Sequence, residues 1–290
     1  MSTSRPGTVL KEKINQRRGL MVAGAANALA ARLIEQLGFE AVYLSGAGIT
    51  NTFYGIPDLG FISLADLAQH TAATRDAVAL PIIVDADTGF GNELNVRHTV
   101  RTLERAGANA IQLEDQASPK KCGHFNDKSV IPARQAASKI KAAVDARLND
   151  DFLIIARTDA RAVEGFEAAL ERAQMFIESG ADMTFVEAPL SIDELRRIPQ
   201  ALAVPQLVNV VIGGKTPTLD AGEFAQMGFG LVLYANAALQ GALFGMSAAL
   251  TRLRDSGRLD EDSGLVASFA QRQQLVQKDL FDGLALSYMT

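Results

Sequence analysis

The single cysteine of this chain lies in a short polar segment that could carry out acid–base chemistry. Cys122 belongs to residues 120–124 (KKCGH), soon after a hydrophobic run that ends in Glu114 and Asp115. A lone thiol cannot form an intramolecular disulfide, and neighbouring cations favour its thiolate, so Cys122 could exchange a proton with a reacting carbon. The alternative is that Cys122 is an inert, small apolar residue.

Acidic residues stand at the ends of two successive hydrophobic runs that precede this segment. Asp85 and Asp87 are two positions apart at the end of a hydrophobic run, so they would face the same way in a strand, and Glu114 ends the next run. Carboxylate oxygens suit a hard divalent cation that keeps several waters. The pattern favours Mg²⁺, with Mn²⁺ as the other ion of this kind, over a purely structural salt-bridge role.

Two further segments favour binding of an anion. The backbone N–H groups of residues 45–48 (SGAG) could form an anion-binding nest, and Arg157 offers a fork for a carboxylate. With a divalent cation, these groups describe a pocket for a small carboxylic acid. The cation would stabilise charge on an oxygen as a neighbouring bond breaks, and Cys122 could protonate the resulting carbanion.

A repeated pattern indicates how these residues are positioned. Four segments contain an amphipathic stretch, a glycine and then a hydrophobic run, and the glycines are Gly38, Gly107, Gly180 and Gly228. Glycine at that place ends a helix, and the run behind it has the length of a buried strand. Four more hydrophobic runs lie between them, near residues 20–23, 81–84, 152–155 and 205–208.

Eight buried strands alternating with helices predict a parallel sheet covered by helices. The number eight favours a closed (β/α)₈ barrel over an open, doubly wound sheet. We expect one domain over residues 1–290, with residues 237–290 as a helical C-terminal extension that breaks near 255–258 and resumes around 268–280. Active sites of such barrels lie where the strands end, and nearly every predicted strand here ends in a polar or charged residue.

Composition narrows the function classes. The chain has 290 residues, a net charge of −5 and 48% hydrophobic residues. This balance argues against a nucleic-acid partner, and no hydrophobic run has the length of a membrane helix or a signal peptide. We therefore expect a cytoplasmic protein that acts on a small molecule, with neither nucleic acid nor membrane as a partner.

The motifs together resemble the isocitrate lyase and phosphoenolpyruvate mutase superfamily. The resemblance runs from about Arg5 to the end of the chain and rests on segments 45–46 (SG), 85–91 (DADTGFG), 114–116 (EDQ) and 120–124 (KKCGH), with Asp58. The last of these segments resembles the carbon–carbon lyase branch, which includes 2-methylisocitrate and 2,3-dimethylmalate lyases. The resemblance implies a (β/α)₈ barrel whose last helix swaps between subunits, a homotetramer built as a dimer of dimers, and Mg²⁺.

The resemblance also implies roles for individual residues. Asp85 would bind Mg²⁺ directly, and three acids would hold its waters: Asp58, Asp87 and Glu114. Cys122 would protonate the enolate formed on cleavage, supported on a mobile loop, residues 117–131, by Lys120, Gly123 and His124. The remaining residues would surround the substrate, and they are Tyr43, which we count as catalytic, with Ser45, Gly46, Ala47, Arg157, Glu187 and Asn209.

The implied reaction is cleavage of a 2-hydroxy di- or tricarboxylate to a 2-oxo acid, such as pyruvate, and a carboxylic acid. The alternatives are oxaloacetate decarboxylation, rearrangement of a phosphonate or carboxyphosphonate, and a binding protein without catalysis. Ile212 stands where the resembling lyases usually have glutamate, which leaves the substrate open. Phe185, Leu233 and Ala235 would form an apolar wall that sizes the substrate's alkyl group.

Overall fold

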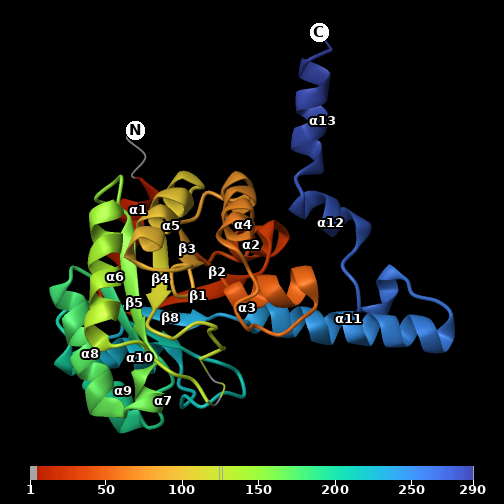
Figure 1. Cartoon of the computed structure of the whole chain (residues 1–290). Coiled ribbons are helices and arrows are strands. Elements are labelled where there is room, and N and C mark those ends of the chain that lie inside the picture. The colour runs from red at the N-terminus through yellow and green to blue at the C-terminus, as the bar shows by residue number, and fades with distance from the viewer. Residues whose placement is uncertain (1–4, 124, 126, 290) are drawn as a thin grey trace.

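The computed structural model describes residues 5–123, 125 and 127–289, and at its centre lies a closed barrel of eight parallel strands (Figure 1). Each strand pairs with its neighbours in the sequence, and the first pairs with the last to close the sheet. The strands are β1 (Leu20–Ala25), β2 (Val42–Leu44), β3 (Ile82–Asp85), β4 (Ala110–Glu114), β5 (Leu153–Thr158), β6 (Met183–Val186), β7 (Gln206–Asn209) and β8 (Leu231–Tyr234). The predicted barrel is confirmed.

Helices follow the strands and form the outer layer. They are α2 (Ala28–Gln36), α3 (Gly46–Ile49), the π-helix η1 (Thr50–Tyr54), α4 (Leu64–Ala77), α5 (Glu93–Arg105), α6 (Ala133–Ala146), α7 (Ala160–Val163), α8 (Phe166–Glu178), α9 (Ile192–Ala201) and α10 (Ala221–Met227). The glycines that predicted the helix-to-strand joints all have positive φ, between 85° and 102°. A residue with a Cβ would be strained there, which explains why glycine occupies these joints.

Alternation along the strands separates two apolar layers. Residues such as Val84 and Ile111 face the surrounding helices, whereas Ile83 and Ile155 face the barrel interior. Helix α1 (Pro6–Asn15) contributes Leu10 to the interior cluster, so it covers one end of the barrel. At the other end, the carboxyl ends of the strands carry the polar residues predicted from the sequence.

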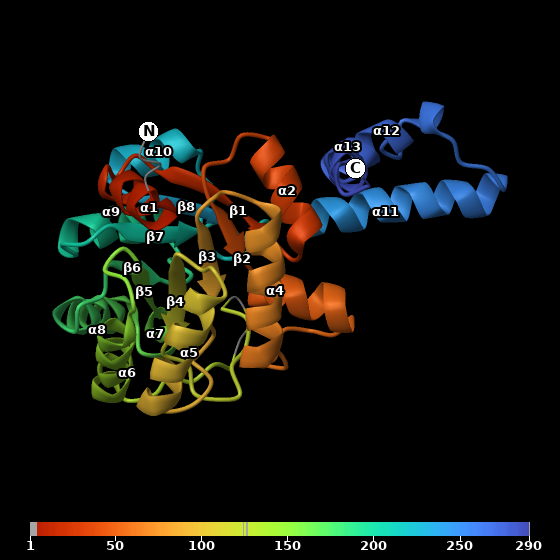
Figure 2. The ribbon, with the colours of Figure 1, turned by 90° about the horizontal axis from the view of Figure 1, so that it is seen from above.

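The C-terminal segment leaves the barrel as a long arm (Figures 1 and 2). It comprises α11 (Ala237–Ser256), the 3₁₀ turn η2 (Glu261–Ser263), α12 (Phe269–Leu275) and α13 (Lys278–Ser287). One helix was expected around residues 268–280, and two are present because Gln277 has a φ of 58° and interrupts the helical backbone. Among the described residues, no helix is both long and apolar enough to cross a lipid bilayer.

We predict that Gly24→Ala destabilises the barrel. A Cβ on Gly24 would overlap the Ala235 carbonyl oxygen and lie 2.6 Å from its carbonyl carbon, so β1 and β8 would have to separate. Overpacking of this kind costs about 3 kcal/mol, which thermal or urea unfolding measures. Gly241→Ala is the control, because its Cβ would meet no atom within 4 Å. Equal stability of the two variants would contradict the prediction.

Candidate active site

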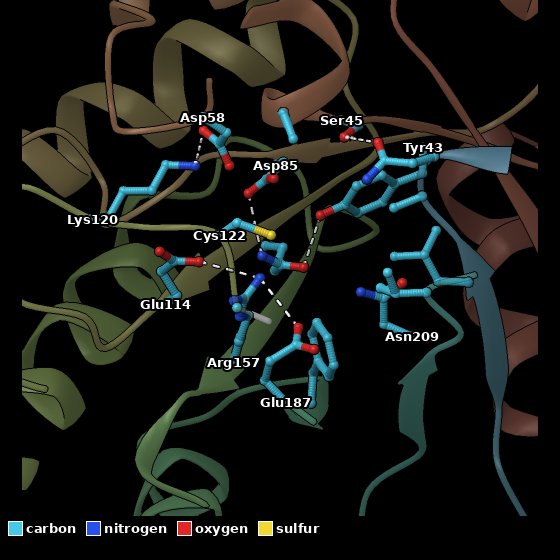
Figure 3. A pocket seen from close by; sticks show the side chains of 18 of the residues that line it. Tyr43, Ser45, Asp58, Asp85, Glu114, Lys120, Cys122, Arg157, Glu187 and Asn209 are labelled. Atoms are coloured by element: carbon cyan, nitrogen blue, oxygen red, sulfur yellow. Dashed lines mark hydrogen bonds and ion pairs between the residues drawn. The ribbon is translucent and has the colours of Figure 1, made fainter. Parts of the chain in front are cut away.

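A polar cavity opens at the carboxyl ends of the strands (Figure 3). It contains most of the residues that the sequence predicted for the site. Those that line it are Tyr43, Ser45, Ala47, Asp58, Asp85, Glu114, Lys120, Cys122, Gly123, Arg157, Glu187 and Asn209. Gly46 and Asp87 lie directly behind this lining, and His124 lies outside the described residues.

Lys120 joins two of the predicted acids. Its Nζ lies 2.6 Å from Asp58 Oδ1 and 2.8 Å from Asp87 Oδ1, and all three side chains are buried. Burial raises the pKa of Asp87 to about 7, helped by the nearby Asp85 and Asp58, while Lys120 opposes the shift. Burial alone would lower the pKa of Lys120, but the surrounding carboxylates, with Asp87 foremost, raise it above its usual value. Lys120 is therefore a fixed positive charge at the cavity wall.

The remaining acids leave room for a further cation. Asp85 Oδ2 accepts a hydrogen bond from the Gly46 N–H at 3.3 Å, and Glu114 Oε1 is buried with no hydrogen-bond partner among the described residues. Burial raises the pKa of Glu114 well above its usual value, an effect that the Arg157 charge only partly offsets. Hard carboxylate oxygens that are short of positive charge fit a divalent cation such as Mg²⁺.

These acids do not form a complete cage. Within the described residues, no group of three or more His, Cys, Asp or Glu side chains is placed to hold a metal ion by itself. Mg²⁺ commonly binds through one or two carboxylates and keeps its waters, so an incomplete protein ligand set is compatible with this ion.

A buried hydrogen-bond relay connects the tyrosine to the acids. The Tyr43 hydroxyl donates to Gln112 Oε1 at 2.8 Å, and Gln112 Nε2 donates to Asp85 Oδ1 at 3.2 Å. Burial raises the pKa of Tyr43 well above its usual value, and Asp85 adds to this. The phenol therefore stays protonated at neutral pH, so Tyr43 is a hydrogen-bond donor in this site rather than a base.

Arg157 is held differently from the sequence-based expectation. Its Nε and Nη2 donate to the two oxygens of Asp159 at 2.9 and 3.1 Å, so the fork expected for a substrate carboxylate is taken. Only Nη1 is directed at the acids of the cavity, with Glu114 and Glu187 each at 3.4 Å. These carboxylates raise the pKa of Arg157 although burial opposes them, so the guanidinium keeps its charge.

Cys122 points into the cavity from the loop after β4 (Figure 3). Gly123 follows it and packs tightly against the barrel: a Cβ there would lie 2.6 Å from Glu187 Cγ and closer still to Arg157 Nη2. Only glycine allows the backbone to approach this closely without displacing those side chains. The basic loop thus brings the thiol over the acids of β4 and its neighbours.

Part of the cavity lining is apolar. Phe185, Leu233 and Ala235 line the cavity with Val211, and Asn209 Oδ1 is buried there with no hydrogen-bond partner among the described residues. Ile212 is 54% exposed and is not part of the lining. Position 212 therefore lies outside the cavity wall, so isoleucine in place of glutamate does not change the lining in this structure.

Three polar residues of the site were not among the residues predicted for it. Gln112 and Asp159 form the contacts described above, and Asn236 Oδ1 accepts from the Ser45 hydroxyl at 3.4 Å. A signal existed for Gln112, because it lies two residues before Glu114 and so faces the same way in β4. Asp159 follows Arg157 by the same spacing.

The fold and the site agree with comparisons to known proteins. The phosphoenolpyruvate phosphomutase family model matches residues 10–254, and the chain belongs to that family. It is 47% identical to the 2-methylisocitrate lyase of Aeropyrum pernix, over 87% of this chain and 81% of that protein. It is 37% identical to the 2,3-dimethylmalate lyase of Eubacterium barkeri, over 97% of each. The predicted superfamily and lyase class are confirmed.

The solved structures that resemble this chain include enzymes named for other reactions. A 2,3-dimethylmalate lyase superposes with a TM-score of 0.92 at 30% identity, covering 99% of this chain and 96% of that one. An oxaloacetate acetylhydrolase bound to 3,3-difluorooxalacetate gives 0.91 at 30% identity, covering 98% and 97%. A phosphonopyruvate hydrolase complex with oxalate and Mg²⁺ gives 0.87 at 29% identity, covering 98% and 99%.

We predict that Gly123→Ala lowers the lyase turnover number about 10²-fold, because the loop that carries Cys122 can no longer seat against Arg157 and Glu187. A misplacement of about 1 Å has effects of this size. Steady-state kinetics measure the change, and thermal unfolding should be close to that of the original chain. Ser129→Ala, an exposed change in the same loop, is the control. Full activity of Gly123→Ala would show that the seated loop is unimportant.

Proposed function

We propose that this enzyme cleaves the C2–C3 bond of a 2-hydroxy dicarboxylate with an alkyl substituent, of the dimethylmalate or alkylmalate type. The products are a 2-oxo acid such as pyruvate and a shorter carboxylic acid. The observation that carries the proposal is the mixed lining of the cavity. Acids, Lys120, Arg157 and Cys122 line it together with the apolar side chains of Phe185, Val211 and Leu233 and the Asn209 amide.

The charge distribution favours two substrate carboxylates over three. The cations among the described lining residues are Lys120, Lys121 and Arg157, and two of these already have carboxylate partners. The Arg157 guanidinium lies over the Phe185 ring, 5.3 Å from its centroid, and the remaining apolar wall of Val211 and Leu233 supplies no cation. A third carboxylate placed there would lose its hydration without compensation, whereas an alkyl group would gain by burial.

In the proposed reaction, one carboxylate of the pocket takes the proton of the substrate's 2-hydroxyl group as the C2–C3 bond breaks. The electron pair of that bond passes to C3 and its carboxylate, and C2 becomes the carbonyl carbon of the 2-oxo acid. The Cys122 thiol then gives its proton to C3. Lys120 stands two residues before Cys122, and its fixed charge favours the thiolate that remains.

We propose Mg²⁺ as the cation, with Mn²⁺ as an alternative. Asp85 would hold the ion directly, while Asp58, Asp87 and Glu114 would hold its waters. When bound, the ion supplies positive charge for the oxygen anions of the substrate and product. The residues of this chain do the rest. Tyr43 and Gln112 fix Asp85, and the Gly46 N–H donates to the same carboxylate. Ser45 and Ala47 would line the carboxylate end of the substrate, and Glu187 and Asn209 would close the pocket.

Cys122 separates this proposal from phosphonate rearrangement, because a reaction in which a phosphoryl group migrates has no carbanion to protonate. The strand-eight end, residues 233–236, offers no histidine for oxaloacetate decarboxylation. Both reactions nevertheless belong in the test, as does hydrolysis of oxaloacetate, because structural neighbours bear such names.

The test is a panel assay with Mg²⁺ that measures release of the 2-oxo acid or other product. The panel contains 2,3-dimethylmalate, 2-ethylmalate, 2-methylisocitrate, isocitrate, oxaloacetate and phosphonopyruvate. We expect the highest kcat/KM for an alkylmalate, and a loss of about 10²–10⁴-fold in kcat for Cys122→Ser, the range that a general acid contributes. Activity confined to phosphonopyruvate, or near-normal turnover by Cys122→Ser, would overturn the lyase mechanism proposed here.

We also propose that residues 1–290 form one domain whose extension, residues 237–290, packs on another subunit in a homotetramer. Large apolar side chains of the arm are exposed in the single chain, and they include Phe244, Leu250, Phe269, Phe281 and Tyr288. Helix α2 likewise exposes Leu29 and Leu33, with Leu37 exposed directly after its end, and α12 contacts this helix. Apolar area of this extent marks an interface.

Deleting the residues after Asp255 should therefore yield smaller oligomers, because it removes α12 and α13 with their apolar side chains. Size-exclusion chromatography with light scattering measures the mass of the particle. The full chain is the reference, and Lys278→Ala is a control that changes only an exposed ion pair within α13. A truncated protein of unchanged subunit number would contradict the swapped arrangement.

A further inference from the structure

The loop between β4 and α6 is a flap on a short two-stranded stem. The Ile131 N–H donates to the Asp115 carbonyl and the Ala117 N–H donates to the Ser129 carbonyl, each at 2.9 Å. An antiparallel bridge between Gln116 and Val130 lies between these bonds. The stem holds the two ends of the flap together, but it does not by itself press the tip, which carries Cys122, against the barrel.

Two lysines tie this tip to the barrel on opposite sides of Cys122. Lys120 reaches Asp58 and Asp87, as described above. Lys128 lies at the other end of the tip, where its Nζ donates to Asp159 Oδ1 at 2.6 Å and to the carbonyl oxygen of Gly123. The Lys128 ammonium group thus binds both the Asp159 carboxylate of the barrel and the backbone carbonyl of Gly123, the residue after Cys122.

The Lys128–Asp159 contact is buried. The Lys128 side chain is 2% exposed and that of Asp159 is 0% exposed. The Asp159 carboxylate also accepts two hydrogen bonds from Arg157, and the Asp159 backbone N–H donates to Asp115 Oδ1 at 2.9 Å. Burial would raise the pKa of Asp159, but Arg157 and Lys128 together lower it below its usual value.

Lys128 is not among the residues that line the cavity. Its influence on chemistry must therefore pass through Gly123 and Asp159. When the flap lifts, Lys128 has to leave a buried carboxylate, and Asp159 keeps only Arg157 as a cationic partner among the described residues. Because Asp159 would then lose one of its two cationic partners, the contact favours the seated flap.

We propose that Lys128 is a positioning residue, a latch that seats the flap so that Cys122 lies over the reacting carbon. The proposal rests on the proposed acid role of Cys122 for its kinetic consequence, but seating of the flap can be measured without turnover. The latch also joins the flap to Arg157 through their shared partner Asp159. Closure of the flap and orientation of the Arg157 guanidinium are thereby parts of one arrangement.

The experiment uses the fact that Cys122 is the only cysteine in the chain. The rate of its alkylation by iodoacetamide, followed by mass spectrometry on the full-length protein without substrate, reports how often the flap lifts. We expect Lys128→Met to raise this rate at least about tenfold and to lower kcat about 10²-fold, with KM changed much less. Loss of a nearby positive charge alone would instead slow alkylation, since less thiolate would be present.

Lys141→Met is the matched control, because Lys141 is an exposed lysine on α6 that pairs with Asp145 one turn along the same helix. It should alkylate and turn over like the original chain. Lys128→Arg keeps the charge and should recover part of both effects, and Lys128→Gln serves if the methionine variant does not fold. An alkylation rate within twofold of the original in folded Lys128→Met or Lys128→Gln would overturn the latch.

The two proposals fail separately. Faster alkylation in a chain that cleaves no substrate of the panel would support the latch and overturn the proposed lyase substrate. Normal alkylation with normal cleavage of an alkylmalate would overturn the latch alone.

Discussion

The site depends on an excess of buried negative charge at one end of the barrel. Among the described residues, six carboxylates there share three cations, Lys120, Lys128 and Arg157. The carboxylates belong to Asp58, Asp85, Asp87, Glu114, Asp159 and Glu187. Such an arrangement is unfavourable without partners, because each buried carboxylate loses its hydration. Lys120 and Arg157 are each divided between several acids, which also fixes the distances between the groups that meet a substrate.

The closed sheet explains how these charges come together from distant parts of the sequence. Inward-facing positions recur every second residue, so the apolar residues inside the barrel give way to polar ones at the next inward position. Ile83 precedes Asp85, Ile155 precedes Arg157, and Phe185 precedes Glu187 in this manner. The cavity is therefore the last layer of the barrel interior, with charged groups in place of a hydrophobic filling.

This regularity sets how far the sequence could predict the molecule. The glycine joints and hydrophobic runs predicted the barrel, and strand-end residues such as Glu114 and Arg157 line the cavity. Which group pairs with which could not be predicted, because Asp159 and a substrate carboxylate are chemically equivalent partners for the Arg157 fork. The same limit applies to Gln112, whose amide could have packed as an ordinary buried polar residue. Only three-dimensional distances distinguish these possibilities.

The junction of β8 and α11 connects the wall of the cavity directly to the C-terminal arm. Ala235 and Asn236 line the cavity, and α11 begins at the next residue and runs outward as the exposed arm (Figure 2). No flexible linker separates the two, and Asn236 is bonded back to Ser45 at the mouth of β2. A displacement of α11 would therefore also displace Ala235 and Asn236 in the cavity wall. Changes that adapt the arm to a different neighbour would also reshape the space available to the substrate.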